Sequence, residues 1–417
     1  MPPSQPIRAT RGVRDILPRE RAAWRVAEEA AERIAERFGY QQIETPILEP
    51  AELVERGVGG ETDIVAKELY KFNDRDKRWL VLRPEATAGV VRAYFEGNLN
   101  QGPQPARLYL IGPMFRHDKP QAGRYRQLYQ FDLEAIGDDS PALDAEVIEI
   151  AVRWFEELGL KGVSLQLNSI GDAACRPAYK AALVAFLEPL RDKLSHDSRR
   201  RIDTNPLRVL DSKEDEELLR EAPLISDYLC DPCLEAFALV RRLLDQAGID
   251  YTVNPRIVRG LDYYTRTAFE FWHGAIGSQQ NALGGGGRYD GLAEDIGWPA
   301  TAAVGFACGL DRTVAMLGEE AVAITTPPPA EVLVIGDGVR PEQLAEVGRL
   351  CRSSRSTAVD YTERSLAAKM RAANRVGAPW VVLMNAEEAR RQVAQLKSMA
   401  GGEQREVGWQ DLPKALA

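Results

Sequence analysis

The spacing of apolar residues predicts a helix followed by a strand near the start of the chain. Apolar side chains recur at helical spacing over residues 24–38, and Gly39 stops this helix. Residues 41–48 then follow a strand pattern that Pro46 interrupts. Because proline cannot donate to a strand ladder, we expect this strand at the edge of a sheet.

Paired strand patterns occupy the next part of the chain. Residues 69–72 and 79–82 flank a polar turn, and a helix beginning near Glu85 reaches about Phe95. The alternating runs 108–111 and 128–131 enclose a Gly/Pro-containing polar loop, so they predict an antiparallel hairpin.

The pattern changes again in the second half of the chain. A helix over 140–158 and a strand over 163–168 precede a charged, helical stretch of about 172–250, which we interpret as an inserted helical module. A strand over 268–272 follows, and residues 304–312 lead into a helix through Leu317. The proline-rich residues 326–330 are the clearest linker, and beyond them a β-α-β-α-β order predicts a small α/β domain over 331–417.

Composition narrows the class of protein. The 417 residues allow two or three domains with sizeable cores. The N-terminus lacks a secretory pattern and no apolar run is long enough for a membrane span, so we expect a cytoplasmic protein with no membrane partner. A net charge of −9 argues weakly against nucleic-acid binding, although local basic patches can still bind RNA.

The five cysteines do not form a disulfide framework. Cys230 and Cys233 form one C-x-x-C pair, which supplies only two metal ligands. We therefore expect thiols that pack between helices, and no metal site.

Cationic residues are concentrated in the loop of the predicted hairpin. Arg116 follows a strand end, where its side chain is half inside, and a half-buried guanidinium needs an anionic partner. Among the adjacent residues, only Asp118 is acidic and could form a structural ion pair with Arg116. A solvated basic loop is one interpretation, and a site that binds polyphosphate is the other. Glycine-rich dinucleotide and P-loop fingerprints are absent from the sequence.

These stretches resemble a known family. FRHDKPQAGRYRQ, at 115–127, resembles motif 2 of the class II aminoacyl-tRNA synthetases in its histidyl-tRNA synthetase form, and 304–312 resembles motif 3. RGLDYYTRTAFEF, at 259–271, and GGGGRYDGL, at 284–292, resemble the two histidine-specific motifs. The first helix and strand resemble motif 1, the dimer-forming element. The family implies an α+β catalytic core on an antiparallel sheet (1–325) with the helical insertion, and a C-terminal α/β anticodon-binding domain (331–417).

The resemblance also implies the site. Arg116 and Arg259 are expected to be catalytic, near the α-phosphate of ATP, with Arg124 and Arg312 as further ATP ligands. Glu134 and Tyr264, with Tyr289 nearby, match positions that face the imidazole. The residues around the α-ammonium, and the others assigned to the histidine site, are Glu85, Ala86, Thr87, Gln130 and Tyr263.

The implied reaction joins L-histidine to tRNA(His) through a histidyl-adenylate in a homodimer, with ATP and Mg²⁺ as substrate and no permanently bound cofactor. Lys119 stands where relatives often have arginine, in the loop that contacts the acceptor end of the tRNA, so the resemblance does not say which bases this loop recognises. Asp311 stands where many relatives have glutamate. One alternative is the catalytically silent, synthetase-like regulatory subunit of ATP phosphoribosyltransferase. Another is an ATP-dependent amide ligase on a class II-like core.

Overall fold

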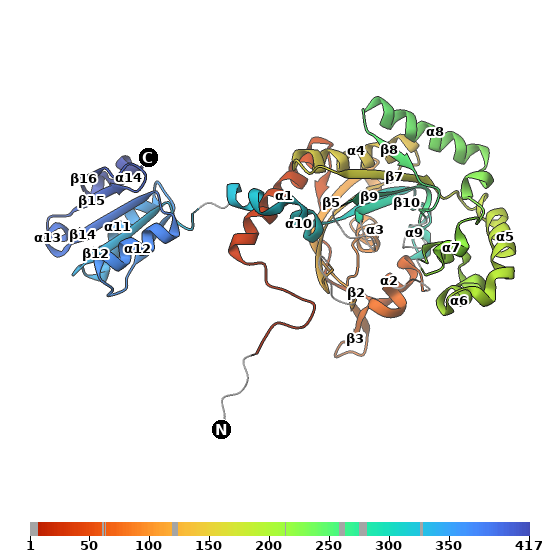
Figure 1. Cartoon of the computed structure of the whole chain (residues 1–417), viewed down its shortest axis with the longest axis horizontal. Coiled ribbons are helices and arrows are strands. Elements are labelled where there is room, and N and C mark those ends of the chain that lie inside the picture. Colours follow the sequence, from red (N-terminus) through yellow and green to blue (C-terminus); the bar gives the residue numbers. More distant parts are fainter. Residues whose placement is uncertain are drawn as a thin grey trace, which may run out of the picture. The chain divides into compact units, whose positions relative to one another are not determined.

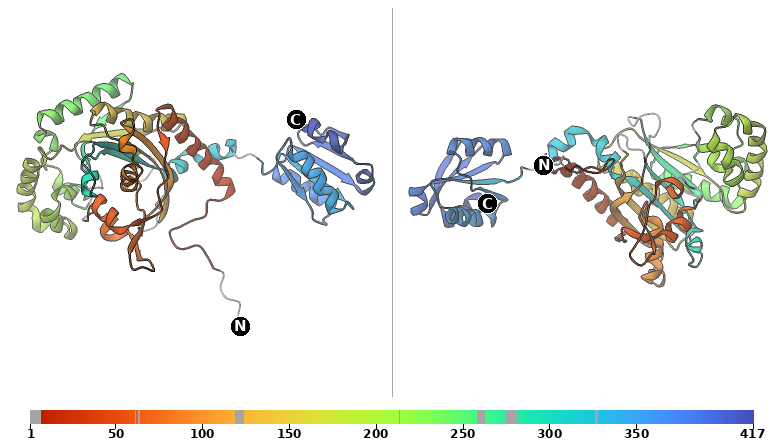
Figure 2. Two further views of the ribbon diagram at one scale, coloured as in Figure 1. Left: turned by 180° about the vertical axis from the view of Figure 1, so that it is seen from behind. Right: turned by 90° about the horizontal axis from the view of Figure 1, so that it is seen from below.

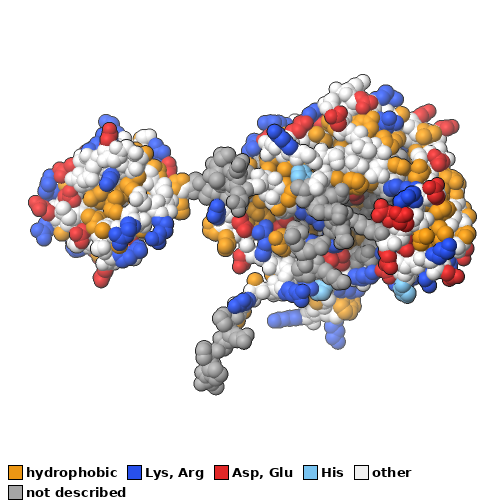
Figure 3. Space-filling view, in the orientation of Figure 1, with side chains coloured by type: hydrophobic (Ala, Val, Ile, Leu, Met, Phe, Trp, Pro, Cys, Tyr) orange, Lys and Arg blue, Asp and Glu red, His pale blue; other side chains and the backbone are white. Residues whose placement is uncertain are grey.

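The computed structural model describes residues 7–60, 62, 64–118, 124–212, 214–257, 263–274, 282–325 and 328–417. Contacts between Cα atoms divide the chain into a unit up to Ile324 and a unit from Thr325 onward. Charged side chains of both signs are spread over the visible face of each unit (Figure 3). In the part of the chain that is described, no helix is long and apolar enough to cross a membrane.

A large, mainly antiparallel sheet forms the centre of the first unit, in the order β1-β5-β6-β11-β10-β9-β7-β8. Its bounds are β1 Gln41–Gln42, β5 Ala106–Phe115, β6 Gln127–Ile136, β7 Val163–Ser169, β8 Tyr251–Val253, β9 Thr265–His273, β10 Ala282–Arg288 and β11 Ala303–Gly309. The predicted hairpin is confirmed as β5 and β6, which pair from Ala106 opposite Ile136 to Phe115 opposite Gln127. The parallel pairs, β1 with β5 and β7 with β8, lie at the two edges.

Helices α1 (Pro18–Arg37), α4 (Pro141–Glu157) and α8 (Asp231–Gln246) cover one face of this sheet (Figure 1). Their apolar stripes pack with alternate residues of β6, such as Phe131 and Leu133, in one core. The opposite face carries a second core, built from α3 (Thr87–Glu96), α9 (Leu292–Asp295) and the tyrosines that precede β9. Because side chains alternate along a strand, β6 contributes to both cores.

The expected strand over 41–48 is wrong in one respect. Residues 41–42 form β1 in the large sheet, whereas β2 (Leu48–Pro50) joins a separate sheet with β4 (Trp79–Leu82) and β3 (Tyr70–Asn73). Pro46 lies between the two, where the chain leaves one ladder and enters the other.

The inserted helical module lies at one end of the first unit as a separate group of short helices (Figure 2). It contains α5 (Arg176–Leu187), α6 (His196–Thr204) and α7 (Glu216–Leu219), and it has its own small core around Leu183 and Leu187. Helix α10 (Leu310–Thr325) follows β11 and breaks at Gly318, whose φ is +75°. The expected end of this helix at Leu317 is therefore close to the break.

The C-terminal unit contains the predicted β-α-β-α-β order and extends it. Its sheet runs β13-β12-β14-β15-β16, with parallel pairing among the first three and antiparallel pairing after β14. The strands are β12 Val332–Asp337, β13 Thr357–Asp360, β14 Trp380–Asn385, β15 Val393–Ser398 and β16 Gln404–Gly408. The helices are α11 Pro341–Arg352, α12 Leu366–Val376, α13 Ala386–Arg390 and α14 Leu412–Leu416. The expected α+β core with an inserted module and a C-terminal α/β domain is confirmed.

Candidate active site

A cavity of about 950 Å³ lies between the large sheet and the helical module. Its walls come from β6, β9, β10 and β11, from the start of α3, and from the module around Glu216 and Arg220. The predicted site residues that line it are Glu85, Thr87, Arg116, Arg124, Gln130, Tyr263, Tyr264, Tyr289 and Arg312. Segments that are up to 227 positions apart in the sequence, from Glu85 to Arg312, thus meet at one surface.

One end of the cavity is acidic because of how β6 alternates. Gln130, Asp132 and Glu134 point to the same face of the strand, and all three are buried. The Glu134 carboxylate lies behind the cavity wall and accepts hydrogen bonds from the Thr87 hydroxyl at 2.6 Å and from the Tyr289 hydroxyl. Two hydroxyl donors on one carboxylate fix its orientation.

Glu85 supplies a second buried carboxylate at this end. Its oxygens accept hydrogen bonds from the backbone N–H groups of Thr87, at 2.8 Å, and Ala88, at 3.1 Å. These are the donors that the first turn of α3 leaves unpaired, so Glu85 caps the helix and Ala86 stands at the cap position. Helix capping and ligand binding are compatible here, because a carboxylate has further lone pairs to offer.

Burial raises the pKa of this group of carboxyls. It raises the pKa of Glu134 and of Asp132 well above their ordinary values, and the neighbouring charge of Glu85 adds to both shifts. Burial also raises the pKa of Glu85, although the N–H groups it accepts and the Arg116 guanidinium oppose the shift. Three acids that are costly to ionise together favour a cationic ligand.

Tyrosine rings form the wall beside this acidic end. The ring centroids of Tyr263 and Tyr264 lie 4.7 Å apart, and those of Tyr263 and Tyr289 lie 5.5 Å apart. Each side chain is at most 7% exposed. Burial raises the pKa of Tyr263 and of Tyr289 well above the ordinary value, so their hydroxyls stay protonated and can donate.

Glycines on the neighbouring strands make room for these side chains. A Cβ on Gly305 would lie 1.7 Å from Glu134 Oε2, and a Cβ on Gly287 would lie 2.9 Å from the Tyr264 ring. The glycine run was expected where a backbone approaches a ligand. In the structure Gly284 and Gly285 do line the cavity, while Gly286 and Gly287 chiefly allow close strand packing.

Arginine side chains also line the cavity. Arg116 is half-buried, and its Nε donates to the carbonyl of Pro84 at 2.8 Å. Arg312 donates to the Ala282 carbonyl at 2.5 Å. Burial lowers the pKa of Arg312, and the charges of Arg124 and Arg116 lower it further. Guanidiniums that destabilise one another in this way favour an anionic ligand between them.

Asp118, the proposed acidic partner of Arg116, pairs with a different arginine. Its carboxylate contacts the Arg124 Nε, and Arg124 Nη2 lies 3.7 Å from Glu68. A phosphate at Arg124 would therefore compete with two carboxylates. Arg259 and the loop residue Lys119 lie outside the described residues.

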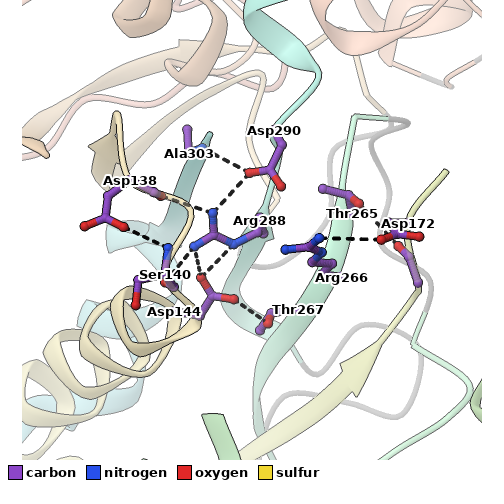
Figure 4. Close-up of polar contacts among 11 residues, drawn as sticks. Asp138, Ser140, Asp144, Asp172, Thr265, Arg266, Thr267, Arg288, Asp290 and Ala303 are labelled. Carbon is purple, nitrogen blue, oxygen red and sulfur yellow. Dashed lines mark hydrogen bonds and ion pairs between the residues drawn. The ribbon is translucent and has the colours of Figure 1, made fainter. Parts of the chain in front are cut away.

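Sequence reasoning missed several residues that shape the site. Asp132 lies between Gln130 and Glu134 on β6, so strand alternation would have placed its side chain on the same face as theirs. Arg288, in GGGGRYDGL, is fully buried and donates to Asp144 at 2.9 and 2.5 Å, and to the carbonyls of Asp138 and Ser140 (Figure 4). The fixed network holds the end of β10 against the start of α4, which no local pattern indicates.

Comparisons with known proteins show the family of this chain. The family model described as histidyl-tRNA synthetase matches residues 12–313, and the model described as anticodon binding domain matches 332–417. The histidine–tRNA ligase of Desulforamulus reducens is 43% identical over 406 residues, which cover 96% of this chain and 97% of the relative. The enzyme of Pelotomaculum thermopropionicum is 44% identical over 401 residues, covering 95% and 94%.

A solved structure is also similar along the whole chain. The apo histidyl-tRNA synthetase of S. aureus superposes with a TM-score of 0.82 at 33% identity, covering 98% of this chain and 99% of that one. The regulatory-subunit interpretation is less well supported, because full-length relatives at this identity are ligases and the anticodon-binding domain is present. With its fold, its two matched domains and its full-length relatives in agreement, this chain belongs to the histidyl-tRNA synthetase family.

Proposed function

We propose that this member of the ligase family attaches L-histidine to tRNA(His) through a histidyl-adenylate formed in the cavity between sheet and module. The observation that carries the proposal is the polarity of the cavity. Buried Glu85 and three buried tyrosines line the same cavity as the guanidiniums of Arg116 and Arg312. The acid and the tyrosines suit an amino acid with an ammonium and an imidazole, and the guanidiniums suit a triphosphate.

In the first step a carboxylate oxygen of histidine attacks the α-phosphorus of ATP, a new P–O bond forms, and the bond to pyrophosphate breaks. ATP enters as its magnesium complex. The reaction needs positioning and charge stabilisation more than a base, because the attacking carboxylate is already ionised. We assign the α-phosphate to Arg116 together with Arg259, and the outer phosphates to Arg312, with Arg124 as a further phosphate ligand.

We assign the imidazole to Glu134, whose two hydroxyl donors leave it able to accept a third hydrogen bond from a ring N–H. Tyr264 and Tyr289 border the same position. The α-ammonium is assigned to Glu85, Thr87 and Gln130. An amino acid without a ring N–H leaves this buried carboxylate without its third hydrogen bond, so selection by about 10⁴ is within reach.

In the second step the terminal ribose hydroxyl of the tRNA attacks the carbonyl carbon of the adenylate. The C–O bond to the α-phosphate breaks, AMP leaves, and the hydroxyl proton passes to the departing AMP phosphate or to solvent. We propose that the domain over 331–417 binds the anticodon, that 1–325 carries the chemistry, and that two chains form a homodimer through the first helix and the strand after it.

Histidine-dependent exchange of pyrophosphate into ATP tests this function directly. With twenty amino acids compared at equal concentration, histidine alone should support rapid exchange, and tRNA(His) should then accept the histidyl group. An amide ligase would respond to a different amino acid. A protein that binds histidine and shows no exchange would overturn the proposal and favour the regulatory subunit.

A further inference from the structure

Four potential metal ligands meet where the helical module joins the large sheet. Asp172 and Cys175 follow β7, and Cys230 and Cys233 stand at the start of α8. One ligand atom from each residue lies within 4.8 Å of all the others. The C-x-x-C at 230–233 offered only two ligands in the sequence. The fold supplies the other two from a D-x-x-C that lies 55 residues earlier.

Both halves of the cluster are tight turns in which residues i and i+3 face the same point. Asp172 Oδ1 accepts hydrogen bonds from the N–H groups of Ala174, at 3.0 Å, and Cys175, at 3.3 Å. The Cys230 N–H donates to Cys175 Sγ at 3.1 Å, and the two sulfurs are 3.2 Å apart. The backbone therefore already directs these four side chains together.

The size of the cluster suits a tetrahedral zinc ion. Zn–S bonds of about 2.3 Å and Zn–O bonds of about 2.0–2.2 Å place neighbouring ligand atoms roughly 3.3–3.8 Å apart. Ligand atoms that all lie within 4.8 Å of one another need to move by only about 1 Å to reach this geometry. Thiolate-rich sets select zinc over the harder Mg²⁺.

The surroundings hold the ligands in place. Arg266 lies 3.6 Å from the outer oxygen of Asp172 (Figure 4). Gly171 has a φ of +64°, and a Cβ on it would lie 2.9 Å from the Cβ of Cys175, so the turn has no room for a side chain. Cys175 and Cys233 are buried. Outer contacts of this kind orient the ligands of structural metal sites.

We propose that Asp172, Cys175, Cys230 and Cys233 bind one structural zinc ion that anchors the helical module to the catalytic sheet. Four protein ligands leave no open position, which is typical of structural zinc rather than catalytic zinc. The site is linked to the cavity by the next residue, because Arg176 donates to the backbone carbonyl of Tyr264. The ion takes no part in the reaction, and it fixes the base of the segment that carries Tyr264.

Metal analysis of the full-length chain tests the proposal. Protein purified under reducing conditions without chelator should contain about one zinc ion per chain. After the zinc is removed, Co²⁺ should produce thiolate charge-transfer absorption and the visible bands of a tetrahedral site. Removing zinc should also make the module between α5 and α8 easier to cleave with protease, and adding zinc back should restore its resistance.

Variants separate this site from the other thiols. Cys230→Ser and Cys233→Ser should lose the zinc and the cobalt spectrum. Cys351→Ser, at a buried cysteine of the C-terminal unit, is the matched control and should keep both. Asp172→Cys should keep the metal and intensify the cobalt charge-transfer band, because it adds a fourth thiolate.

The wild-type protein alone can overturn the inference, even if a variant fails to fold. Absence of both stoichiometric zinc and a cobalt–thiolate band in reduced wild-type protein would show that the thiols merely pack between helices. A mass two hydrogens lower, located by peptide mapping to Cys175 and Cys230, would instead identify a disulfide and would equally rule out the zinc site.

Discussion

Replacing Glu134 by glutamine should weaken histidine binding and leave ATP binding intact. The amide keeps the size of the side chain, but it has only one oxygen where the carboxylate serves Thr87 and Tyr289 with two. Glutamine has one acceptor oxygen fewer than glutamate and carries no charge. It therefore loses the charge-assisted hydrogen bond to the imidazole, which is worth about 1.5–3 kcal/mol. At 1.4 kcal/mol per tenfold change, the KM for histidine should rise roughly 10- to 150-fold.

Folding should not suffer from the same change. Burial raises the pKa of Glu134, so the folded chain binds a proton here more tightly than the unfolded chain does. Stability contributed at this position therefore falls as pH rises toward and through the raised pKa, and a neutral amide removes that dependence. The melting temperature of Glu134→Gln at neutral pH should equal or exceed that of the wild type.

Pyrophosphate exchange with one substrate varied at a time measures both KM values. Glu146→Gln is the control, since that carboxylate also accepts a hydrogen bond from a tyrosine hydroxyl, Tyr40, but its partners Tyr40 and Arg107 do not line the cavity, whereas both partners of Glu134 do. It should leave both KM values within about twofold of the wild type. Equal losses for histidine and ATP in Glu134→Gln, or a clear fall in its melting temperature, would refute the assignment.

Other changes test the same site from different sides. Gly305→Ala should cost about 1–3 kcal/mol of stability and raise the KM for histidine, because the new methyl would overlap Glu134 Oε2, whereas Gly291→Ala has open space and should do neither. Arg288→Lys should cost about 3 kcal/mol, seen as a lower melting temperature, because an ammonium cannot reproduce the two hydrogen bonds that Nε and Nη2 donate to Asp144 Oδ1. Histidine binding should release protons, since a cation lowers the raised pKa of buried carboxyls; calorimetric heats that do not depend on the buffer would contradict this.

Sequence reasoning predicted the fold correctly where the local residue pattern agrees with the position of the segment in the fold. The runs 108–111 and 128–131 around a Gly/Pro loop predicted the antiparallel hairpin that β5 and β6 form, although not its register. The glycine run is different, because glycine has low strand propensity, yet β10 is a central strand. Its reason is steric and non-local: a Cβ on Gly286 would lie 2.0 Å from the Gly305 carbonyl.

The C-terminal strands β15 and β16 and the ligand cluster at the module were also beyond local reasoning. β15 is paired along its length by β14 and β16, and this ladder compensates for its mixed polar pattern. Cys175 and Cys230, 55 residues apart in the sequence, meet only because β7 ends where α8 starts. Spacing rules detect ligands within one turn of chain, and they cannot pair two such turns.

The segment over 83–87 connects the proposed histidine site to the proposed phosphate site. Arg83 is buried and donates to the Thr45 and Pro113 carbonyls, which fixes the segment in the sheet. The next carbonyl, of Pro84, accepts from Arg116, and the carboxylate after it, of Glu85, caps α3. The acid that we assign to the ammonium and the guanidinium that we assign to the phosphate are thus fixed at adjacent positions, Glu85 and Pro84. Such rigid spacing brings the histidine carboxylate to the α-phosphorus without further ordering, and positioning of this kind supplies much of the rate in phosphoryl transfer.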